Sequence, residues 1–448
     1  MRLLPGPTRA VAAAAAAAMT LAVAMAASAA GQAYGAAKAK GKAGSKAASE
    51  ATEEELEKIR ALPYVDFVEG ETGEVATGLV FSEKGRFQDG YTLYVNRGTC
   101  RVDLLDPAGS VTNTWVRTPC HHWGYAELRP DGDLLVLTQE KLEGATTEEL
   151  DERRSLLRFA WDGRLIRESG GAPHHALEVL PDGRILILTV RTRRIPGIDP
   201  DREIRDDRLA IMSPDGGILE EHSIAEMIAG GMEGFELKRS GMSVLKRAGA
   251  IDLVHANAID ALPSAVAAGK DPVHVEGAIL LTLRHQDAVV VIDPATWKAV
   301  WAWGQGEISG PHDGSWLDNG HILVFDNGIS RRHSRVVEVD PLTRKIVWEY
   351  RAPVPEDLFS RTNGAAQRLP NGNTLVTDSN KGRAFEVTPA GEVVWKYVNP
   401  RMGGPRGRSS IIKMIRLPAA HVEAARAAGE ARRPSGEAPQ AGRPPPAP

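Results

Sequence analysis

Short apolar runs, each introduced by a tight-turn signal, recur along most of the chain. The runs are rich in Val, Ile and Leu and have the length of β-strands. A glycine precedes each run, in most cases directly after Asp or Asn, which is the composition of a hairpin turn. The six glycines are Gly90, Gly132, Gly183, Gly277, Gly320 and Gly372. Helical periodicity is nearly absent between the runs, so the pattern disfavours a doubly wound α/β fold.

A second turn signal alternates with the first. It is marked by Asp106, Asp162, Asp215, Asp293, Asp340 and Thr388. Two hairpins per repeat make a four-stranded antiparallel unit, and six units predict an all-β fold, a six-bladed β-propeller. The step from Gly183 to Gly277 is 94 residues, against 42 to 52 for the others, so we expect an insertion with a helix around residues 222–240. Four outer runs end in tryptophan, which we assign to packing: Trp115, Trp301, Trp348 and Trp395.

The two ends of the chain differ in composition from this repeat. Residues 1–30 begin with arginines and continue as an Ala-rich apolar stretch, which predicts a secretory signal peptide and a periplasmic or secreted protein; an uncleaved membrane anchor is the alternative. Residues 31–50 read as a low-complexity linker, and residues 417–448 as a tail, helical over 421–433 and then Pro-rich. The propeller is therefore expected over residues 51–416, preceded by a short helix with Thr52 as its N-cap, and no membrane span is expected in the mature form.

Charge and cysteine content exclude several classes of function. The net charge is −4 and the basic residues are scattered, so no nucleic-acid partner is indicated. Cys100 and Cys120 can form one disulfide in an exported protein or remain two packed thiols, but they do not make a zinc site. The chain also lacks a G-x-x-x-x-G-K-[ST] phosphate loop, so a nucleotide donor is not indicated.

Histidines occur at the start of the predicted innermost strand in four of the six repeats. They are His122, His175, His255 and His312. Strands alternate in direction, so the start of the innermost strand and the end of the second strand share one rim, opposite the Gly132, Gly183, Gly320 and Gly372 turns. The pattern therefore predicts a ring of imidazoles at one mouth of the propeller, where ligand sites of this fold gather.

The ends of the second strands place Arg284 and Asn327 on the same rim as the histidines. One histidine at a strand start is more often structural than catalytic, but four at matched positions, with two repeats lacking them, indicate a site. Metal binding is the first competitor, since imidazole is a good ligand. The sequence shows no close ligand spacing, and Arg284 would sit poorly beside a cation, so we rank an anion above a metal.

Several stretches resemble the bacterial arylsulfotransferase (arylsulfate sulfotransferase) family. The most specific are "PHDGSWLDNGHILVFDNG" and "AQRLPNGNTLVTDSNKGRAFEVTPAGEVVWKY", and "VHANAID" and "ILLTLRHQDAVVVID" agree with them. The resemblance implies a six-bladed propeller that moves a sulfuryl group from one phenol to another without a cofactor or metal. Its partners would be small phenols and aryl sulfates, and the oligomeric state stays open.

The resemblance also implies roles for individual residues. His312 of "PHD" would be the nucleophile that becomes sulfohistidine, with His255, Arg284 and one member of the "HH" pair as catalytic partners. Within that pair we prefer His175, because its offset from the following turn equals that of His312. The substrate-binding set would then be His174, His122 and Asn327.

The side-chain chemistry is consistent with this reading. Arg284 offers a permanently charged, planar fork for sulfuryl oxygens. A neutral imidazole is a competent nucleophile near pH 7. Two alternatives remain open: a quinoprotein-like dehydrogenase, since "DPLTRKIVWEY" is similar to blades of that class, and a non-enzymatic periplasmic binding or scaffold protein.

Overall fold

The computed structural model describes residues 67–69, 76–118, 122–139, 146–239, 250–267, 271–404 and 407–433. All of them belong to the compact unit of residues 50–448. The expected signal peptide, the linker, the helix after Thr52, Cys120 and the Pro-rich end of the tail lie outside these ranges. No helix within the ranges has the length and apolar character needed to cross a membrane.

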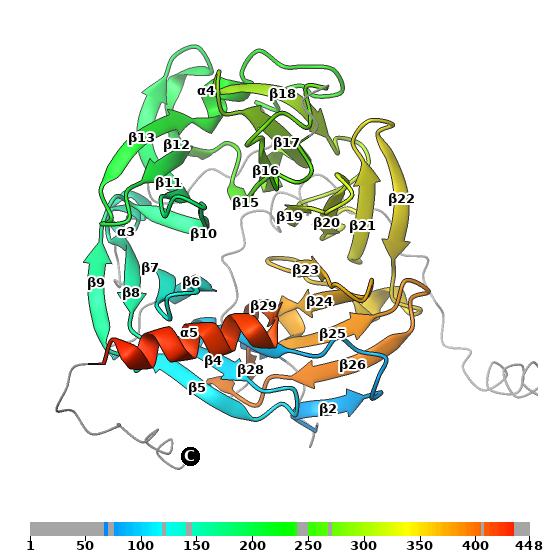
Figure 1. Cartoon of the computed structure of the whole chain (residues 1–448). Coiled ribbons are helices and arrows are strands. Elements are labelled where there is room, and N and C mark those ends of the chain that lie inside the picture. The colour runs from blue at the N-terminus through cyan, green and yellow to red at the C-terminus, as the bar shows by residue number, and fades with distance from the viewer. Residues whose placement is uncertain are drawn as a thin grey trace, which may run out of the picture. The chain divides into compact units, whose positions relative to one another are not determined.

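Six antiparallel sheets surround a common axis as the blades of a propeller, as the sequence pattern predicts (Figure 1). Blade 2 contains β6 (His122–Leu128), β7 (Leu134–Gln139), β8 (Arg154–Phe159) and β9 (Leu165–Ser169). Blade 3 contains β10 (Pro173–Val179), β11 (Ile185–Ile195), β12 (Asp199–Met212) and β13 (Ile218–Ser223). Blade 4 contains β15 (Ala256–Ala261), β16 (Ile279–Leu283), β17 (Ala288–Asp293) and β18 (Lys298–Trp303). Blade 5 contains β19 (His312–Trp316), β20 (Ile322–Asp326), β21 (Arg335–Asp340) and β22 (Lys345–Tyr350).

The two ends of the chain close the ring. Blade 6 contains β23 (Ala365–Arg368), β24 (Thr374–Asp378), β25 (Arg383–Val387) and β26 (Val393–Val398), with β2 (Gly78–Ser82) added at its outer edge. Blade 1 takes its innermost strand from the C-terminal side: β29 (Ile411–Leu417) pairs with β3 (Tyr91–Asn96), which is followed by β4 (Arg101–Leu105) and β5 (Val111–Val116). A small separate sheet joins β1 (Phe67–Glu69), β28 (Gly407–Ser409) and β27 (Met402–Gly404).

This closure corrects two of the predicted first-type turns. Gly90 precedes β3 as expected, but no hairpin joins it to an inner strand, because that strand is β29 from the other end of the chain. Gly277 likewise ends a longer connection, residues 262–278, rather than a tight turn. In both cases the glycine correctly predicts the strand that follows it. The prediction that a tight hairpin joins that strand to the innermost strand of the blade is wrong.

The other four first-type turns share one geometry. Gly132, Gly183, Gly320 and Gly372 have φ between +81° and +87°, a conformation that favours glycine. Each donates its N–H to the carbonyl three residues earlier, inside a hairpin that joins the two innermost strands of its blade. Because the histidines lie at the opposite ends of the same strands, these turns occupy the rim opposite the histidines, as predicted.

The outer-strand tryptophans link neighbouring blades. Trp115 Nε1 donates to the Ala160 carbonyl oxygen at 2.9 Å, from blade 1 to the outer hairpin of blade 2. Trp301 Nε1 makes the equivalent bond from blade 4 to Pro341 of blade 5, at 3.1 Å. Trp348 bonds in the same way to Pro389 of blade 6, at 2.9 Å. The packing role predicted for these residues thus includes a polar link that sets the spacing between blades.

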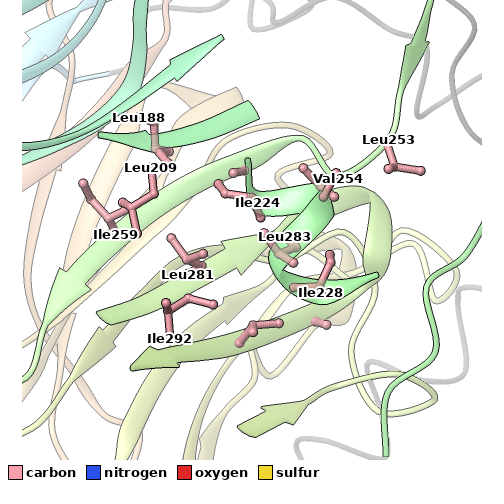
Figure 2. Close-up of a cluster of buried hydrophobic side chains, with 14 of the residues drawn as sticks. Leu188, Leu209, Ile224, Ile228, Leu253, Val254, Ile259, Leu281, Leu283 and Ile292 are labelled. Carbon is pink, nitrogen blue, oxygen red and sulfur yellow. The ribbon is translucent and has the colours of Figure 1, made fainter. Parts of the chain in front are cut away.

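Apolar contacts fill the space between adjacent blades. One buried cluster lies between blades 3 and 4 and includes Leu188, Leu209, Ile259 and Leu281 (Figure 2). Within the described part of the insertion a short helix, α4 (Ile224–Ile228), is present where a longer one was expected, and its C-cap Ala229 is followed by Gly230 and Gly231. The other helices in the described ranges are α3 (Thr147–Glu152) and α5 (Ala419–Ala431), and α5 confirms the helix expected near the C-terminus.

Four carboxylates on the innermost strands connect five consecutive blades, from blade 2 to blade 6. Glu178 of blade 3 accepts the N–H of Ala261 of blade 4 at 2.6 Å. Asp260 of blade 4 accepts the N–H of Trp316 of blade 5, and Asp313 of blade 5 accepts that of Ala366 of blade 6. Glu127 of blade 2 has the same relation to Val179 of blade 3. Burial raises the pKa of Glu127 and of Glu178 to about 7 and that of Asp260 to about 8.

Candidate active site

The four predicted histidines lie at the starts of innermost strands, on one rim. His122 begins β6 and His312 begins β19. His175 is the third residue of β10, and His255 directly precedes β15. The pairing between the two inner strands shifts register at this point in each of the four blades. His175 and His255 also have positive φ values, +57° and +48°, which is strained for a non-glycine residue. The backbone therefore departs from regular strand geometry where the histidines emerge.

A cavity of about 120 Å³ opens among these strand starts. Its polar lining consists of Arg97, His122, Thr138, Gln139, Arg154, His174, His175, Asn257, His312, Asp313, Asn363 and Lys413. Its apolar wall includes Tyr125, Leu137, Leu177, Ile259 and Ile412. An apolar pocket with a few convergent polar groups has the character of a small-molecule site.

His312 is held as a neutral imidazole with a defined tautomer. Its Nδ1 lies 2.8 Å from Asn327 Oδ1 and 3.1 Å from the Gly310 carbonyl oxygen, so Nδ1 carries the proton. The Asn327 amide cannot be reversed, because its Nδ2 donates to the carbonyls of Ser360 and Asn363 at 2.7 and 2.6 Å. Nε2 therefore bears the lone pair, and it accepts the backbone N–H of Asn363 at 3.2 Å. Burial, reinforced by the positive charge of Arg284, lowers the pKa of His312 to about 3.

His255 has a carboxylate where His312 has an amide. Its Nδ1 donates to Asp252 Oδ2 at 2.6 Å, which leaves Nε2 as the other reactive nitrogen. Burial lowers the pKa of His255, while the negative charge of Asp252 opposes that shift. Asp252 lies on β14 (Ile251–Asp252), a two-residue strand that pairs in parallel with β12 of blade 3. The insertion thus supplies the group that orients a histidine of blade 4.

The histidine rings form a continuous array across blades 3 and 4. His174 Nδ1 lies 2.5 Å from His175 Nδ1, and the ring centroids are 5.1 Å apart for His175 and His255 and 4.7 Å apart for His255 and His285. At the end of the array Arg284 Nη1 donates to His285 Nε2 at 3.2 Å. The charge of Arg284 lowers the pKa values of both His255 and His312, so it lies near both rings.

Asp252, His255 and His285 place three potential metal ligands within 4.8 Å of one another. Nδ1 of His255 donates to Asp252, and Nδ1 of His285 donates to the Asp252 carbonyl oxygen at 2.7 Å, so Nε2 is the nitrogen with the lone pair in both rings. Nε2 of His285 accepts from the Arg284 guanidinium, which does not fit a cation ligand. Two guanidiniums flank the group, Arg284 on His285 and Arg205 at 3.9 Å from Asp252 Oδ1. The surroundings favour an anion, in line with the ranking from the sequence.

Some of the predicted site residues line the cavity, and the others lie behind its lining. His122, His174, His175 and His312 line the cavity, whereas His255, Arg284 and Asn327 are not among its lining residues in the described ranges. Arg284 is buried with 2% of its surface exposed, beside the histidine array. Asn327 contacts His312.

Sequence reasoning did not single out Asp252, Asn257, Asn363, Arg97 or Arg154. Asp252 and Asn257 flank His255 in "DLVHAN". Their closeness in sequence to a predicted site residue is the feature from which they could have been predicted. Asn363 has φ of +56° and lies two residues before the innermost strand of blade 6, close to where four other blades carry histidine. A repeat alignment extended to the blades without histidine would have located it.

Comparison with known proteins gives a family match and distant structural similarities. Residues 168–400 match the model of the arylsulfotransferase (ASST) family, and they span the histidine positions of blades 3 to 5. No curated protein matches the chain significantly. A protein of unknown function from Bacteroides caccae is 15% identical, covering 73% of this chain and 98% of its own, with a TM-score of 0.47. Virginiamycin B lyase from Staphylococcus aureus is 14% identical, covering 76% and 88%, with a TM-score of 0.40.

The family match covers more than half of the 448 residues. It includes all of blades 3, 4 and 5 and blade 6 except β2, and with them both ordered imidazoles, His255 and His312. The chain therefore belongs to the arylsulfotransferase family.

Proposed function

We propose that this protein is an arylsulfate sulfotransferase that moves a sulfuryl group from an aryl sulfate to a phenolic acceptor through a sulfohistidine on His312. The observation that carries the proposal is the state of His312: neutral, with the proton on Nδ1 and the lone pair on Nε2, at the wall of the cavity. A neutral imidazole in that tautomer attacks an electrophile without first losing a proton.

In the first half-reaction Nε2 gives up the hydrogen bond that it accepts from the Asn363 N–H and attacks sulfur, and the bond from sulfur to the aryl oxygen breaks. The sulfuryl group becomes bonded to Nε2, and the phenolate leaves with the electron pair. Nδ1 keeps its proton, and its bond to Asn327 persists throughout. Asn327 is thereby a positioning residue for His312 in this proposal, rather than the substrate-binding residue that the sequence suggested.

Proton transfer falls to His255. In the second half-reaction its Nε2 takes the proton from the acceptor phenol, whose oxygen attacks sulfur and breaks the bond from sulfur to His312. The imidazolium so formed is stabilised by Asp252 at 2.6 Å and passes the proton to the next leaving phenolate. Each turnover therefore conserves the proton. Arg284 supplies positive charge close to both histidines for the sulfuryl oxygens.

His174, His175 and His122 are assigned supporting roles in the cavity. His175 lies between His174 and His255, where it can donate to the sulfuryl oxygens or assist the proton transfer.

The proposal includes a location outside the cytoplasm, as residues 1–30 suggest, where the protein has no access to a nucleotide sulfate donor. Mass spectrometry of the periplasmic fraction should find the mature N-terminus after about residue 30.

The test is release of 4-nitrophenol from its sulfate ester, with and without added phenol. We expect release to depend on phenol beyond the first turnover, with ping-pong kinetics. Acid-quenched protein incubated with radiolabelled aryl sulfate should carry acid-labile label on the peptide that contains His312. Transfer without such label would contradict the covalent intermediate. A bound chromophore in the purified protein would instead favour the quinoprotein alternative.

A further inference from the structure

Two histidines and a carboxyl group form a row in blade 3 that leads from the cavity into the protein. His174 and His175 lie on β10 and line the cavity, and Asp207 lies on β12 of the same blade (Figure 1). His175 Nδ1 is 2.5 Å from His174 Nδ1, and His174 Nε2 is 3.3 Å from Asp207 Oδ1. We call these three residues the blade 3 row, and its inner end at Asp207 is fully buried.

The hydrogen bonds give the blade 3 row a direction. His174 Nε2 lies 3.1 Å from the Thr189 carbonyl oxygen, which can only accept, so His174 carries its proton on Nε2. Burial lowers the pKa of both His174 and His175 well below the usual value, so both rings are neutral near pH 7. Nδ1 of His174 is then an acceptor, and Nδ1 of His175 donates to it. Nε2 of His175 therefore bears the lone pair.

Asp207 is placed to receive a proton from His174. Its Oδ2 accepts the Ala256 N–H at 2.7 Å, while Oδ1 lies 3.3 Å from Arg205 Nη1 and faces His174 Nε2. Burial raises the pKa of Asp207 to about 8, although the charge of Arg205 opposes this shift. A carboxyl group with such a pKa can take up and release a proton near neutral pH.

A positive charge on His175 is unfavourable in this position. Burial lowers its pKa, and the charges of neighbouring histidines and arginines lower it further. His255 differs, because the charge of Asp252 opposes the shift of its pKa. His175 can therefore act as a base when the proton that binds Nε2 is matched by release of the proton on Nδ1. The blade 3 row provides that release through His174.

We propose that the blade 3 row is a proton relay, which takes the proton of the acceptor phenol at His175 and holds it at Asp207. The inference rests on the proposed function and gives the reaction a second proton carrier beside His255. Of the two roles named above for His175, the lone pair on Nε2 favours assistance to proton transfer.

Three protons move in one direction in this relay. As the phenolic oxygen attacks sulfur, its proton bonds to Nε2 of His175, the Nδ1 proton of His175 moves to Nδ1 of His174, and the Nε2 proton of His174 moves to Oδ1 of Asp207. Both rings stay neutral, and the carboxylate becomes a carboxylic acid. The His174 Nε2 lone pair then faces the Thr189 oxygen, which is unfavourable, so the reverse transfer readily returns the proton to the next leaving phenolate.

Nitrogen-15 NMR of the full chain with labelled histidine rings tests the arrangement without catalysis. At about pH 9, above the pKa of Asp207, we expect the proton of His175 on Nδ1 and that of His174 on Nε2. His174→Gln and His175→Gln assign the two sets of signals. The opposite tautomer in either ring would contradict the relay.

Asp207→Asn removes the group that holds the proton, and Asp206→Asn is the matched control. Asp206 is equally buried in the same strand, but its carboxylate bonds to Arg193, Arg208 and Ser223 rather than to a histidine. Asp207→Asn should slow phenol-dependent turnover at least about tenfold and change the rate of label formation from 4-nitrophenyl sulfate by less than about twofold, because 4-nitrophenolate needs little protonation. Asp206→Asn should keep both rates within about twofold of wild type.

The solvent deuterium isotope effect separates a relay from structural support. Several protons in motion make the rate of phenol-dependent turnover a curved function of the deuterium fraction in wild type, and Asp207→Asn should give a straight line. A straight line in wild type, equal slowing of label formation and turnover in Asp207→Asn, or the same slowing in Asp206→Asn would overturn the relay. Expected tautomers in a protein that transfers no sulfuryl group from 4-nitrophenyl sulfate would support the row as a proton path and reject the proposed function.

Discussion

His312, which is buried, and His255, which is partly buried, lie at the starts of neighbouring inner strands but differ in the group that holds Nδ1. A neutral amide, Asn327, holds His312, and a carboxylate, Asp252, holds His255. The amide fixes a tautomer without favouring a positive charge, whereas the carboxylate stabilises the imidazolium. In the proposed reaction this difference at Nδ1 suits His312 to the role of nucleophile and His255 to that of proton carrier. Each prediction below tests that division.

Replacing the nucleophile should have the largest effect. His312→Ala removes the only protein atom that forms a bond to sulfur in the proposed reaction, so both half-reactions should be abolished. The measurement is 4-nitrophenol release together with the radiolabel experiment. A variant that keeps its activity would show that the amide-held histidine is not the nucleophile, and direct transfer would have to be considered.

Loss of the proton carrier should be severe but incomplete. His255→Ala should slow phenol-dependent turnover by about 10²- to 10⁴-fold, typical of lost acid–base help. The label on His312 should still form with 4-nitrophenyl sulfate, because 4-nitrophenolate is a good leaving group and needs little protonation. Absence of label in this variant would assign His255 a role in the attack itself.

Changing the carboxylate that holds His255 tests the comparison most directly. Asp252→Asn keeps the size of the side chain but removes the charge, and its amide can force the other tautomer on His255, so we expect a loss of about 10²-fold in turnover. The loss should be greater for acceptors of high pKa, which depend most on the base. A uniform loss across acceptors would instead indicate that Asp252 only supports the local structure.

Arg284→Lys should weaken donor binding and lower kcat/KM by about tenfold, because a point charge does not replace the planar fork. The measurement is steady-state kinetics with 4-nitrophenyl sulfate at several concentrations. Unchanged kinetics would mean that the guanidinium serves the histidine array structurally, through its bond to His285.

The buried neutral histidines also predict acid sensitivity of the fold. Burial lowers the folded-state pKa of His312 and of His285 to about 3, while an unfolded histidine has a pKa of about 6.5. As the pH falls from about 6.5 toward 3 the unfolded state takes up these protons and the native state does not, so each such histidine reduces the free energy of unfolding by about 1.4 kcal/mol per pH unit. His285→Gln should remove one such contribution from the slope in urea titrations between pH 6 and pH 4.5; equal slopes would contradict it.

The sequence predicted the elements that repeat. The outer hairpin turns, four of the glycine turns and the histidines at the starts of inner strands recur from blade to blade, so each occurrence supported the others. The closing strand β29 could not be found in this way, because "IIKMIRL" stands without a turn and its partner β3 is more than 300 residues earlier. Asp252 was not predicted because it lies in the insertion, which has no counterpart in the other blades.

Closure of the ring by β29 has a consequence for when the active site comes into existence. Ile412 and Lys413 of this strand line the cavity, and β29 is the last strand of the chain within the described ranges. Synthesis runs from the N-terminus, and earlier blades can begin to pair while later ones are still absent. The cavity wall is complete only after residues 411–417 have been made and have inserted beside β3. A chain without residues 411–417 therefore still contains both ordered histidines but lacks part of the cavity wall, so substrate binding depends on the insertion of the last strand.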